Sequence, residues 1–432
     1  MFFKSYSDPD KKDRWLPLDN AAKIFPAGAG EERSLVYRLM VELDRPVSYH
    51  TLVEALNRTI GDLPYFTCRL RRGFFWYYFE PDPSGLEVLP DVNLPCRAFH
   101  FRSNQMDQLR VLLRDNRISC EFFHALTDGS GALEFVRTLI EHYAALAEDP
   151  AAAWEEDSYY DELYDELTED SYNKYFNPRV PIPDKLRKAY HLPFPFRAKP
   201  RLRILSAEVP SDQVKAYSKS IGISVTEYLA SVYMSVLQEI YHQVQPQGRP
   251  DKHSVIRIQV PVNLRKLFPS KTLRNFSLFV VPEIDTSLGS YTFEEIVKNV
   301  RFFMQHETEA KQMQRTIYRN VRNEKSYFIR LVPLLLKNLI LAYHFRKLGM
   351  SLYSGLITNL GVVRYSDRAS RMVQRLRFLP PPPDQSRVSL AVVTYEEKMV
   401  ITFANSTRSR LLERKFTQHL RQHGIDVKLL NS

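Results

Sequence analysis

Apolar and polar positions alternate between strand-like and helix-like patterns along the whole chain. Residues 34–42 read as a strand, and Ser48 then caps a helix whose apolar residues recur at helical spacing. Two apolar runs at 109–113 and 118–123 flank a short polar turn and predict a β-hairpin. Strands and helices in alternation over 432 residues indicate an α/β architecture.

The second half of the chain repeats this theme. Two capping-box patterns, which begin at Ser224 and Thr292, predict helices, and the second of these is expected to reach about residue 318. Strands are expected at 205–209, 255–262, 276–284 and 351–360, with a hairpin at 388–395 and 399–404.

An acidic, tyrosine-rich run at 155–170 and a Pro-rich stretch at 177–200 separate the two halves. Charge blocks of this kind are typical of solvated loops and linkers. We therefore expect an N-terminal domain over 1–170, a linker over 171–200 and a C-terminal domain over 201–432.

Composition narrows the class of protein. Hydrophobic residues make up 44% of the chain, which is enough for a substantial core and excludes disorder as the dominant state. A formal charge of +10 favours anionic partners such as nucleotides and phosphorylated cofactors. The basic residues are spread along the chain and no nucleic-acid-binding motif accompanies them, so nucleic acid is not expected as a partner.

Three cysteines in a long chain, at spacings that match no metal site, argue against a disulfide framework or a bound metal. The N-terminal residues soon turn charged, so we expect a cytoplasmic protein. The strongly apolar segment 328–345 is interrupted by Arg330, Pro333 and Lys337 and falls short of the ~20 residues that span a bilayer. It is interpreted as a core or cleft-lining helix, and the alternative is peripheral membrane contact through an apolar face.

One candidate for chemistry is His124, which follows a predicted strand and precedes Asp128-Gly129. An imidazole at a strand end can reach into a cleft, and its near-neutral pKa suits proton transfer. Gly129 would supply a backbone angle closed to other residues. The alternative is a core histidine beside a helix cap.

Two other segments end in polar residues. Arg265 follows an apolar strand and needs a partner if it is buried, and Asp128 is the expected one; the alternative is an exposed arginine. Thr358, Asn359 and Gly361 close a further strand and are suited to donating to an oxyanion or to forming an ordinary tight turn.

These segments, with Asn275-Phe276 and in this order and approximate spacing, resemble the HxxxDG acyltransferase superfamily over most of the chain. That group includes chloramphenicol acetyltransferase, plant BAHD acyltransferases and condensation domains of nonribosomal peptide synthetases, and the chain is most similar to microbial alcohol acetyltransferase-like proteins. Phe123 stands where some relatives carry a second histidine, and the DFGWG segment of the plant enzymes is absent.

The resemblance implies two chloramphenicol-acetyltransferase-like domains, each a mixed sheet packed with helices, around a channel. His124 would be the general base, Asp128 would pair with Arg265, and Thr358 or Asn359 would donate to the oxyanion. The expected reaction moves an acyl group, acetyl above all, from acyl-CoA to a hydroxyl or amine. No permanently bound cofactor is expected, because acyl-CoA is a co-substrate whose candidate contacts are Lys266, Lys271 and Arg274. The alternatives are an acyl donor carried on a phosphopantetheinyl carrier protein, and a non-catalytic scaffold.

Cys120 lies four residues before His124, which raises a cysteine–histidine pair. On a strand, that offset separates the two residues by about 13 Å. Cys120 is therefore interpreted as a core residue.

Overall fold

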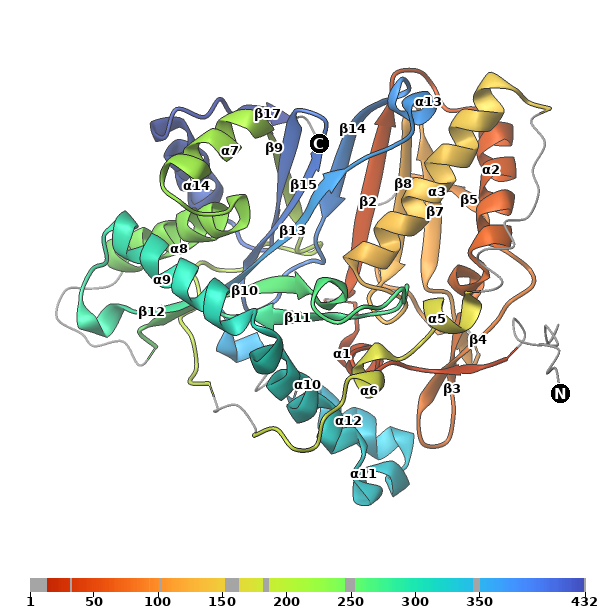
Figure 1. The fold of residues 1–432 in the computed structure, drawn as a ribbon, viewed down its shortest axis with the longest axis horizontal. Helices are drawn as coiled ribbons and strands as arrows, with labels where there is room; N and C mark the ends of the chain where they lie inside the picture. The colour runs from red at the N-terminus through yellow and green to blue at the C-terminus, as the bar shows by residue number, and fades with distance from the viewer. Residues whose placement is uncertain are drawn as a thin grey trace, which may run out of the picture.

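Two α/β halves lie side by side in the computed structural model (Figure 1). The structure describes residues 14–430 except 32, 93, 102, 152–162, 182–185, 245–252 and 345–349. Each half contains a large sheet covered by helices, and the sheets combine parallel and antiparallel strand pairs. The predicted mixed α/β fold is confirmed.

The sheet of the first half has five strands. Its order is β14 (Val373–Leu379), β2 (Val36–Leu43), β8 (Arg117–Phe123), β7 (Leu109–Arg114) and β5 (Val88–Pro90). β7 and β8 form the hairpin expected from the sequence. The predicted helix capped by Ser48 is α2 (Tyr49–Asp62), which packs beside α3 (Gly129–Glu148).

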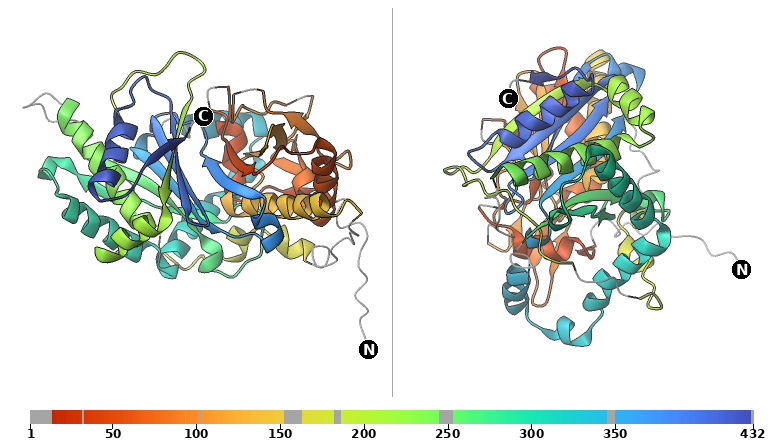
Figure 2. Two further views of the ribbon diagram at one scale, coloured as in Figure 1. Left: turned by 90° about the horizontal axis from the view of Figure 1, so that it is seen from above. Right: turned by 90° about the vertical axis from the view of Figure 1, so that its left-hand side faces the viewer.

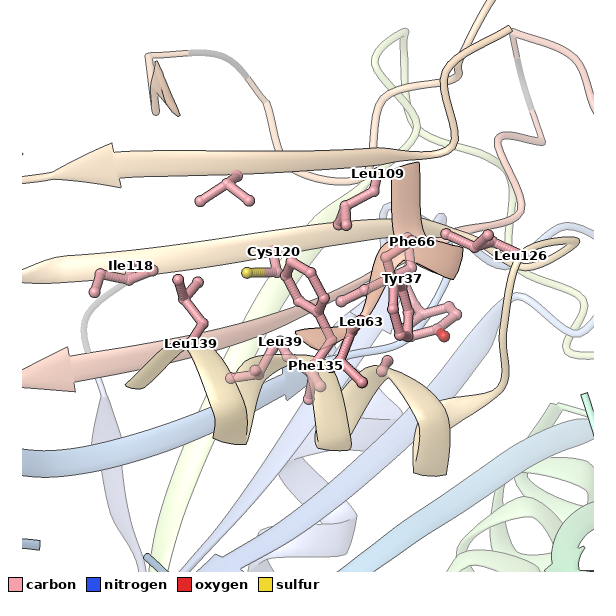
Figure 3. Packing of buried hydrophobic residues seen from close by; sticks show 14 of the residues in the cluster. Tyr37, Leu39, Leu63, Phe66, Leu109, Ile118, Cys120, Leu126, Phe135 and Leu139 are labelled. Carbon is pink, nitrogen blue, oxygen red and sulfur yellow. The ribbon is translucent and has the colours of Figure 1, made fainter. Parts of the chain in front are cut away.

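The apolar face of α3 closes the core of this half. Phe135 and Leu139 point from α3 toward Leu39 and Cys120 on the sheet (Figure 3). Their spacing of four residues places them on one face of the helix, while alternate strand residues supply the opposing surface.

A small sheet extends the first half and bears a projecting hairpin. Its order is β1 (Leu16–Pro17), β4 (Tyr77–Glu80), β3 (Arg69–Arg72) and β6 (Gln105–Met106). The turn between β3 and β4 holds Gly73, Phe74 and Phe75.

The sheet of the second half has eight strands. Seven follow the order β11 (Ser277–Val280), β10 (Val255–Asn263), β13 (Gly355–Val363), β15 (Val388–Tyr395), β16 (Lys398–Asn405), β9 (Arg203–Pro210) and β17 (Lys428–Leu430), while β12 (Glu283–Asp285) pairs with β10. Its helices are α7 (Ser211–Ser220), α8 (Val225–Val244), α9 (Phe293–Glu307) and α14 (Leu411–Gln422). The capping boxes at Ser224 and Thr292 are both present.

Two predicted elements are divided in the structure. The strand expected over 276–284 is two short strands, β11 and β12, that pair with different parts of β10. The long helix expected to reach residue 318 ends at Glu307 and restarts as α10 (Ala310–Glu324). The Thr308 hydroxyl donates to the carbonyl of Met304 at 2.5 Å, a back-bond that favours a bend.

Short helices complete the described chain. They are α1 (Phe25–Gly28), α5 (Tyr164–Leu167), α6 (Ser171–Lys174), α11 (Tyr327–Leu331), α12 (Leu334–His344) and α13 (Asp367–Ser370). No single helix among the described residues is long and apolar enough to cross a bilayer; α7 and α8 meet the requirements of length and composition only as a pair, bent by 83°.

One segment crosses between the halves. β14 belongs by sequence to the second half, yet it pairs antiparallel with β2 at the edge of the first sheet. Arg375 of β14 contacts Glu42 of β2 at 2.6 Å and Glu208 of β9 at 2.7 Å, so one guanidinium joins both halves. The division into 1–170, 171–200 and 201–432 stays a prediction, and the strand pairing adds this crossing to it.

Candidate active site

His124 stands directly after β8, in a loop whose backbone is tied down on both sides. Its N–H donates to the carbonyl of Leu35 at 3.0 Å. Tyr37 and Tyr65 donate through their hydroxyls to the carbonyls of Thr127 and Leu126, at 3.0 and 2.6 Å. The loop is therefore held from the inside by two buried phenols.

The imidazole of His124 is enclosed by aromatic rings. Phe25 of α1 stacks on it with 4.6 Å between ring centroids, and Tyr37 meets it edge-on at 5.2 Å. Burial disfavours the charged form and lowers the pKa of His124 below its usual 6.5, although Asp128 and Asn275 oppose the shift. At neutral pH the ring is uncharged.

A chain of side-chain contacts fixes the tautomer of this ring. The Asn275 amide nitrogen donates to Asp19 and to the carbonyl of Ala125, both at 3.3 Å. Its oxygen then faces Nδ1 of His124 at 3.2 Å and must accept from it. Nδ1 carries the proton, and the lone pair lies on Nε2.

Asp19 is the buried end of this series of side-chain contacts. It is fully buried, and burial raises its pKa to about 6, while Arg274 lowers it. The carboxylate is ionised at neutral pH and accepts from the Asn275 amide. Neither residue was singled out for this role in the sequence, because 151 residues separate Asn275 from the histidine that it orients.

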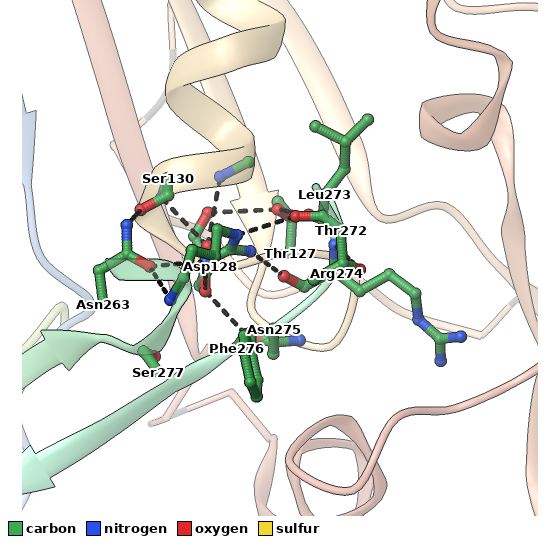
Figure 4. Close-up of polar contacts among 12 residues, drawn as sticks. Thr127, Asp128, Ser130, Asn263, Thr272, Leu273, Arg274, Asn275, Phe276 and Ser277 are labelled. Carbon is green, nitrogen blue, oxygen red and sulfur yellow. Dashed lines mark hydrogen bonds and ion pairs between the residues drawn. The ribbon is translucent and has the colours of Figure 1, made fainter. Parts of the chain in front are cut away.

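Asp128 organises the loop after His124 (Figure 4). One carboxylate oxygen accepts from the N–H groups of Ser130 and Gly131, which caps α3. The other accepts from Arg265 and from the N–H of Phe276, both at 2.8 Å. The predicted pair between Asp128 and Arg265 is present, and it joins α3 to the segment that carries Asn275.

Arg265 and Asn263 complete this junction. Arg265 donates to the carbonyls of Thr272 and Arg274, at 2.9 and 2.5 Å, so its guanidinium is engaged on several sides. Asn263 donates to the Ser130 hydroxyl at 3.0 Å and accepts from the N–H of Arg265. A buried charge needs such partners, which gives Arg265 a structural role.

The backbone angle closed to other residues that the sequence predicts at Gly129 is not present. Gly129 lies in the first turn of α3 without a left-handed backbone angle. An added Cβ there would instead lie 2.6 Å from Cδ2 of Leu360, at the contact with β13. Gly131 is the more constrained glycine, because a Cβ there would lie 2.1 Å from the carbonyl oxygen of Leu273.

Thr358 and Asn359 lie on opposite faces of β13. Asn359 is committed to its surroundings: its amide donates to Thr226 of α8 at 3.1 Å and its oxygen accepts from the N–H of Gly361 at 2.8 Å. Thr358 pairs with Ala391 of β15, which belongs to the core of the first half. Thr358 therefore faces the half that carries His124.

The predicted contacts for CoA are dispersed. Lys266 is exposed and Lys271 pairs with Glu166 at 3.3 Å. Arg274 is buried and donates to the carbonyls of Pro17 and Thr168, so it does not face solvent.

A separate cavity of about 400 Å³ opens beside the start of α8. Lys215, Lys219 and Arg301 line it together with Ser224. This end of α8 also holds Thr226, which contacts Asn359 of β13.

The three cysteines are buried and free. Burial raises the pKa of Cys68 to about 12 and raises the pKa values of Cys96 and Cys120. Cys120 lies in the core next to α3, as predicted (Figure 3). Within the described part of the chain, no group of three or more His, Cys, Asp or Glu side chains is placed to hold a metal ion.

Solved structures share this fold, although no protein-family model matches the sequence and no curated protein matches it. The first condensation domain of the CDA synthetase is 14% identical with a TM-score of 0.58, covering 98% of this chain and 100% of that one. TRI3 trichothecene 15-O-acetyltransferase from Fusarium sporotrichioides is 10% identical with a TM-score of 0.60, covering 94% of each chain. Polyketide synthase associated protein 5 from Mycobacterium tuberculosis is 13% identical with a TM-score of 0.56, covering 94% of this chain and 96% of that one.

The fold is thus the two-domain fold of condensation domains and of this acetyltransferase. At such low sequence identity, the similarity establishes the fold alone. The activity has to be argued from the geometry of the candidate site.

Proposed function

We propose that this chain is an acyltransferase in which His124 is the general base. The acceptor is a hydroxyl or amine, and the donor is an acyl thioester of coenzyme A, with acetyl-CoA as the first candidate. The observation that carries this proposal is the contact of Nδ1 of His124 with the amide oxygen of Asn275, from which the tautomer is assigned. A neutral imidazole with a free lone pair on Nε2 is the form that removes a proton.

In the proposed reaction, Nε2 of His124 takes the proton of the acceptor as its oxygen or nitrogen attacks the thioester carbonyl. The tetrahedral intermediate collapses, the carbon–sulfur bond breaks, and the imidazolium returns the proton to the leaving thiolate. Both substrates react in one ternary complex, so positioning and base catalysis supply the rate.

Thr358 is the proposed oxyanion donor. Its face of β13 is turned toward the first half, whereas the Asn359 amide is already engaged. A hydroxyl aimed at the developing negative charge stabilises the intermediate more than the ground state.

The cavity lined by Lys215, Lys219 and Arg301 is proposed to hold the phosphates of coenzyme A. Three cations around one hollow suit a polyanionic ligand. This site replaces Arg274, which is buried, as the proposed contact.

A carrier protein is the second candidate donor. The likeness to condensation domains over nearly the whole chain favours it. Such a donor presents the same thioester on a phosphopantetheine arm, so His124 would act in the same way.

The test measures thiol release from acetyl-, butyryl- and decanoyl-CoA with a panel of alcohols and amines. We expect acceptor-dependent release that falls by about a hundredfold or more in His124→Ala. His100→Ala, at an exposed histidine, is the matched control and should keep full activity.

Release that is equal in wild type and His124→Ala would contradict the proposed base. No release from any CoA thioester, but transfer from an acylated carrier protein, would establish the second donor. No transfer from either donor would leave a non-catalytic scaffold.

A further inference from the structure

After Leu334, which is buried, helix α12 turns two polar side chains toward the protein and most of its large apolar ones toward solvent. On the inner face, Lys337 donates to the carbonyls of Phe75 and Arg330, at 3.0 and 3.2 Å, and its Nζ lies 3.6 Å from the ring centroid of Trp76. Asn338 donates to the Tyr77 hydroxyl at 2.8 Å. These contacts bind α12 to the hairpin of β3 and β4.

Exposed apolar side chains also occur on the segments next to α12, and together with those of α12 they are here called the apolar platform. Its side chains are between 53% and 80% exposed. They are Phe74 of the hairpin, Leu331 of α11, and Leu335, Leu336, Leu339 and Ile340 of α12.

This arrangement reverses the usual amphipathic helix of a globular protein, whose apolar side faces the core. Soluble proteins rarely expose large contiguous apolar patches unless a partner covers them. The buried ammonium of Lys337 fixes the orientation, because turning the helix over would break its contacts with two carbonyls and Trp76.

The segment of the sequence that carries α10, α11 and α12 is rich in basic residues. Residues 310–349 contain nine Lys and Arg and one acidic residue, Glu324, a net of +8 out of +10 for the chain. Residues 171–207 have the same net charge of +8, so this excess of basic residues is not confined to the platform. Arg322, Lys325 and Arg330 are exposed on α10, α11 and the turn between them.

The platform also projects from the molecule. α11, α12 and the β3–β4 hairpin stand at the lower end in Figure 1, and the helices of this region extend beyond the sheets in the right-hand view of Figure 2. A projecting apolar face with a basic surround fits a broad, deformable and anionic partner.

We propose that the apolar platform docks on the surface of an anionic lipid bilayer. The eleven residues of α12 are only about 16 Å long, so the helix would lie in the plane of the interface and not span it. Leu335 and Leu339 would enter the boundary between headgroups and acyl chains, while the surrounding cations contact lipid phosphates.

The platform is close to the candidate active site through α1. α12 packs against α1, whose Phe25 stacks on the imidazole of His124. Docking would therefore bring one side of this site near the bilayer. The inference goes beyond the proposed acyl transfer and does not depend on it.

Co-sedimentation of the full chain with vesicles tests this proposal. We expect binding to vesicles of phosphatidylcholine with phosphatidylserine, and weaker binding without phosphatidylserine or at high salt. The double variant Leu335→Ser/Leu339→Ser should lose about tenfold or more in apparent affinity. The double variant Arg322→Glu/Lys325→Glu should bind anionic vesicles less tightly than the wild type at low salt. At high salt the charges are screened, so the difference between the two proteins should shrink.

The matched control is Leu288→Ser/Phe302→Ser, which alters two side chains that are 80% and 63% exposed on other elements. It should bind as the wild type does. Equal loss in the control, or no binding of the wild type to anionic vesicles, would overturn the proposal. A dimer that dissociates in the Leu335→Ser/Leu339→Ser variant, without vesicle binding, would identify the platform as a contact between copies of the chain.

Discussion

At the scale of single residues, the site depends on which ring nitrogen of one histidine carries the proton. A neutral imidazole has two tautomers, and only one leaves Nε2 free to accept. Asp19 and Asn275 select that tautomer from behind, while Phe25 and Tyr37 enclose the ring. Asn275 is accordingly a positioning residue that acts through His124.

The pH profile of kcat/KM tests this role. His124 must be neutral to act as a base, and its pKa is lowered by burial, so wild-type activity should fall only on acidification below pH 6.5. Asn275→Asp places a carboxylate next to Nδ1, which favours the imidazolium, so the acidic limb should move to higher pH.

In Asn275→Ala, Nδ1 loses its acceptor and the tautomer is no longer fixed. Nitrogen-15 NMR of the imidazole reports this directly and without an activity assay. An unchanged tautomer in Asn275→Ala, together with an unmoved acidic limb in Asn275→Asp, would rule out the positioning role.

Asp128 should matter first for stability. Asp128→Asn removes the charge facing the largely buried guanidinium of Arg265, and breaking such a pair costs about 3 kcal/mol. Urea unfolding measures the loss. Asp44→Asn is the control, because the pair of Asp44 with Arg45 is exposed and screened by solvent, so this variant should unfold at nearly the same urea concentration as the wild type.

At the scale of elements, the start of α3 packs closely against the second half. The Thr127 hydroxyl donates to the carbonyl of Leu273 at 2.5 Å, and Gly131 leaves no room for a side chain above that same carbonyl. The cap of the helix and its contact with the second half thus use one short segment.

Gly131→Ala should therefore destabilise the protein by about 3 kcal/mol, because backbone must move to admit the methyl group. Thermal unfolding followed by circular dichroism checks this. Gly30→Ala serves as the control, since no atom lies within 4 Å of an added Cβ there, and its effect should stay within about 1 kcal/mol. Similar unfolding of both variants would argue against close packing at α3.

The elements that could be predicted from the sequence are those that local signals define. α2, α8 and α9 begin at recognisable caps, and the β7–β8 hairpin follows from two apolar runs and a turn. The break after Glu307 and the division between β11 and β12 arise from pairing and back-bonding that the pattern does not contain.

The candidate site divides in the same way. His124, Asp128 and Arg265 could be proposed because a loop histidine and a buried charge pair are chemically conspicuous. Asn275 is noted in the sequence only as part of the resemblance and Asp19 not at all, because their function lies in a contact between distant segments. Arg274 is predicted as a contact for coenzyme A but is buried, because the sequence pattern around a cation gives no sign of its burial.

At the scale of the whole molecule, the halves share a strand. β14 completes the sheet of the first half, and Arg375 on it contacts both halves. This crossing strand couples the orientation of one sheet to that of the other, and so it also couples the positions of Thr358 and His124.

A fragment of residues 1–200 should not fold stably by itself. Without β14, the long apolar strand β2 becomes an exposed edge, which favours association between chains. We expect aggregation, or far-ultraviolet circular dichroism with little cooperative unfolding. A soluble, monomeric fragment with a sharp transition would show that β14 is dispensable.

The position of β14 also has a consequence for biosynthesis. Residues 36–43 leave the ribosome early, but their partner at 373–379 follows more than three hundred residues later. At ~5–20 residues per second, the first sheet keeps an open edge for at least about 15 seconds of translation. A chaperone that binds extended apolar segments would have its best opportunity in that interval, and synonymous codons that slow translation after residue 200 should lower the yield of folded protein.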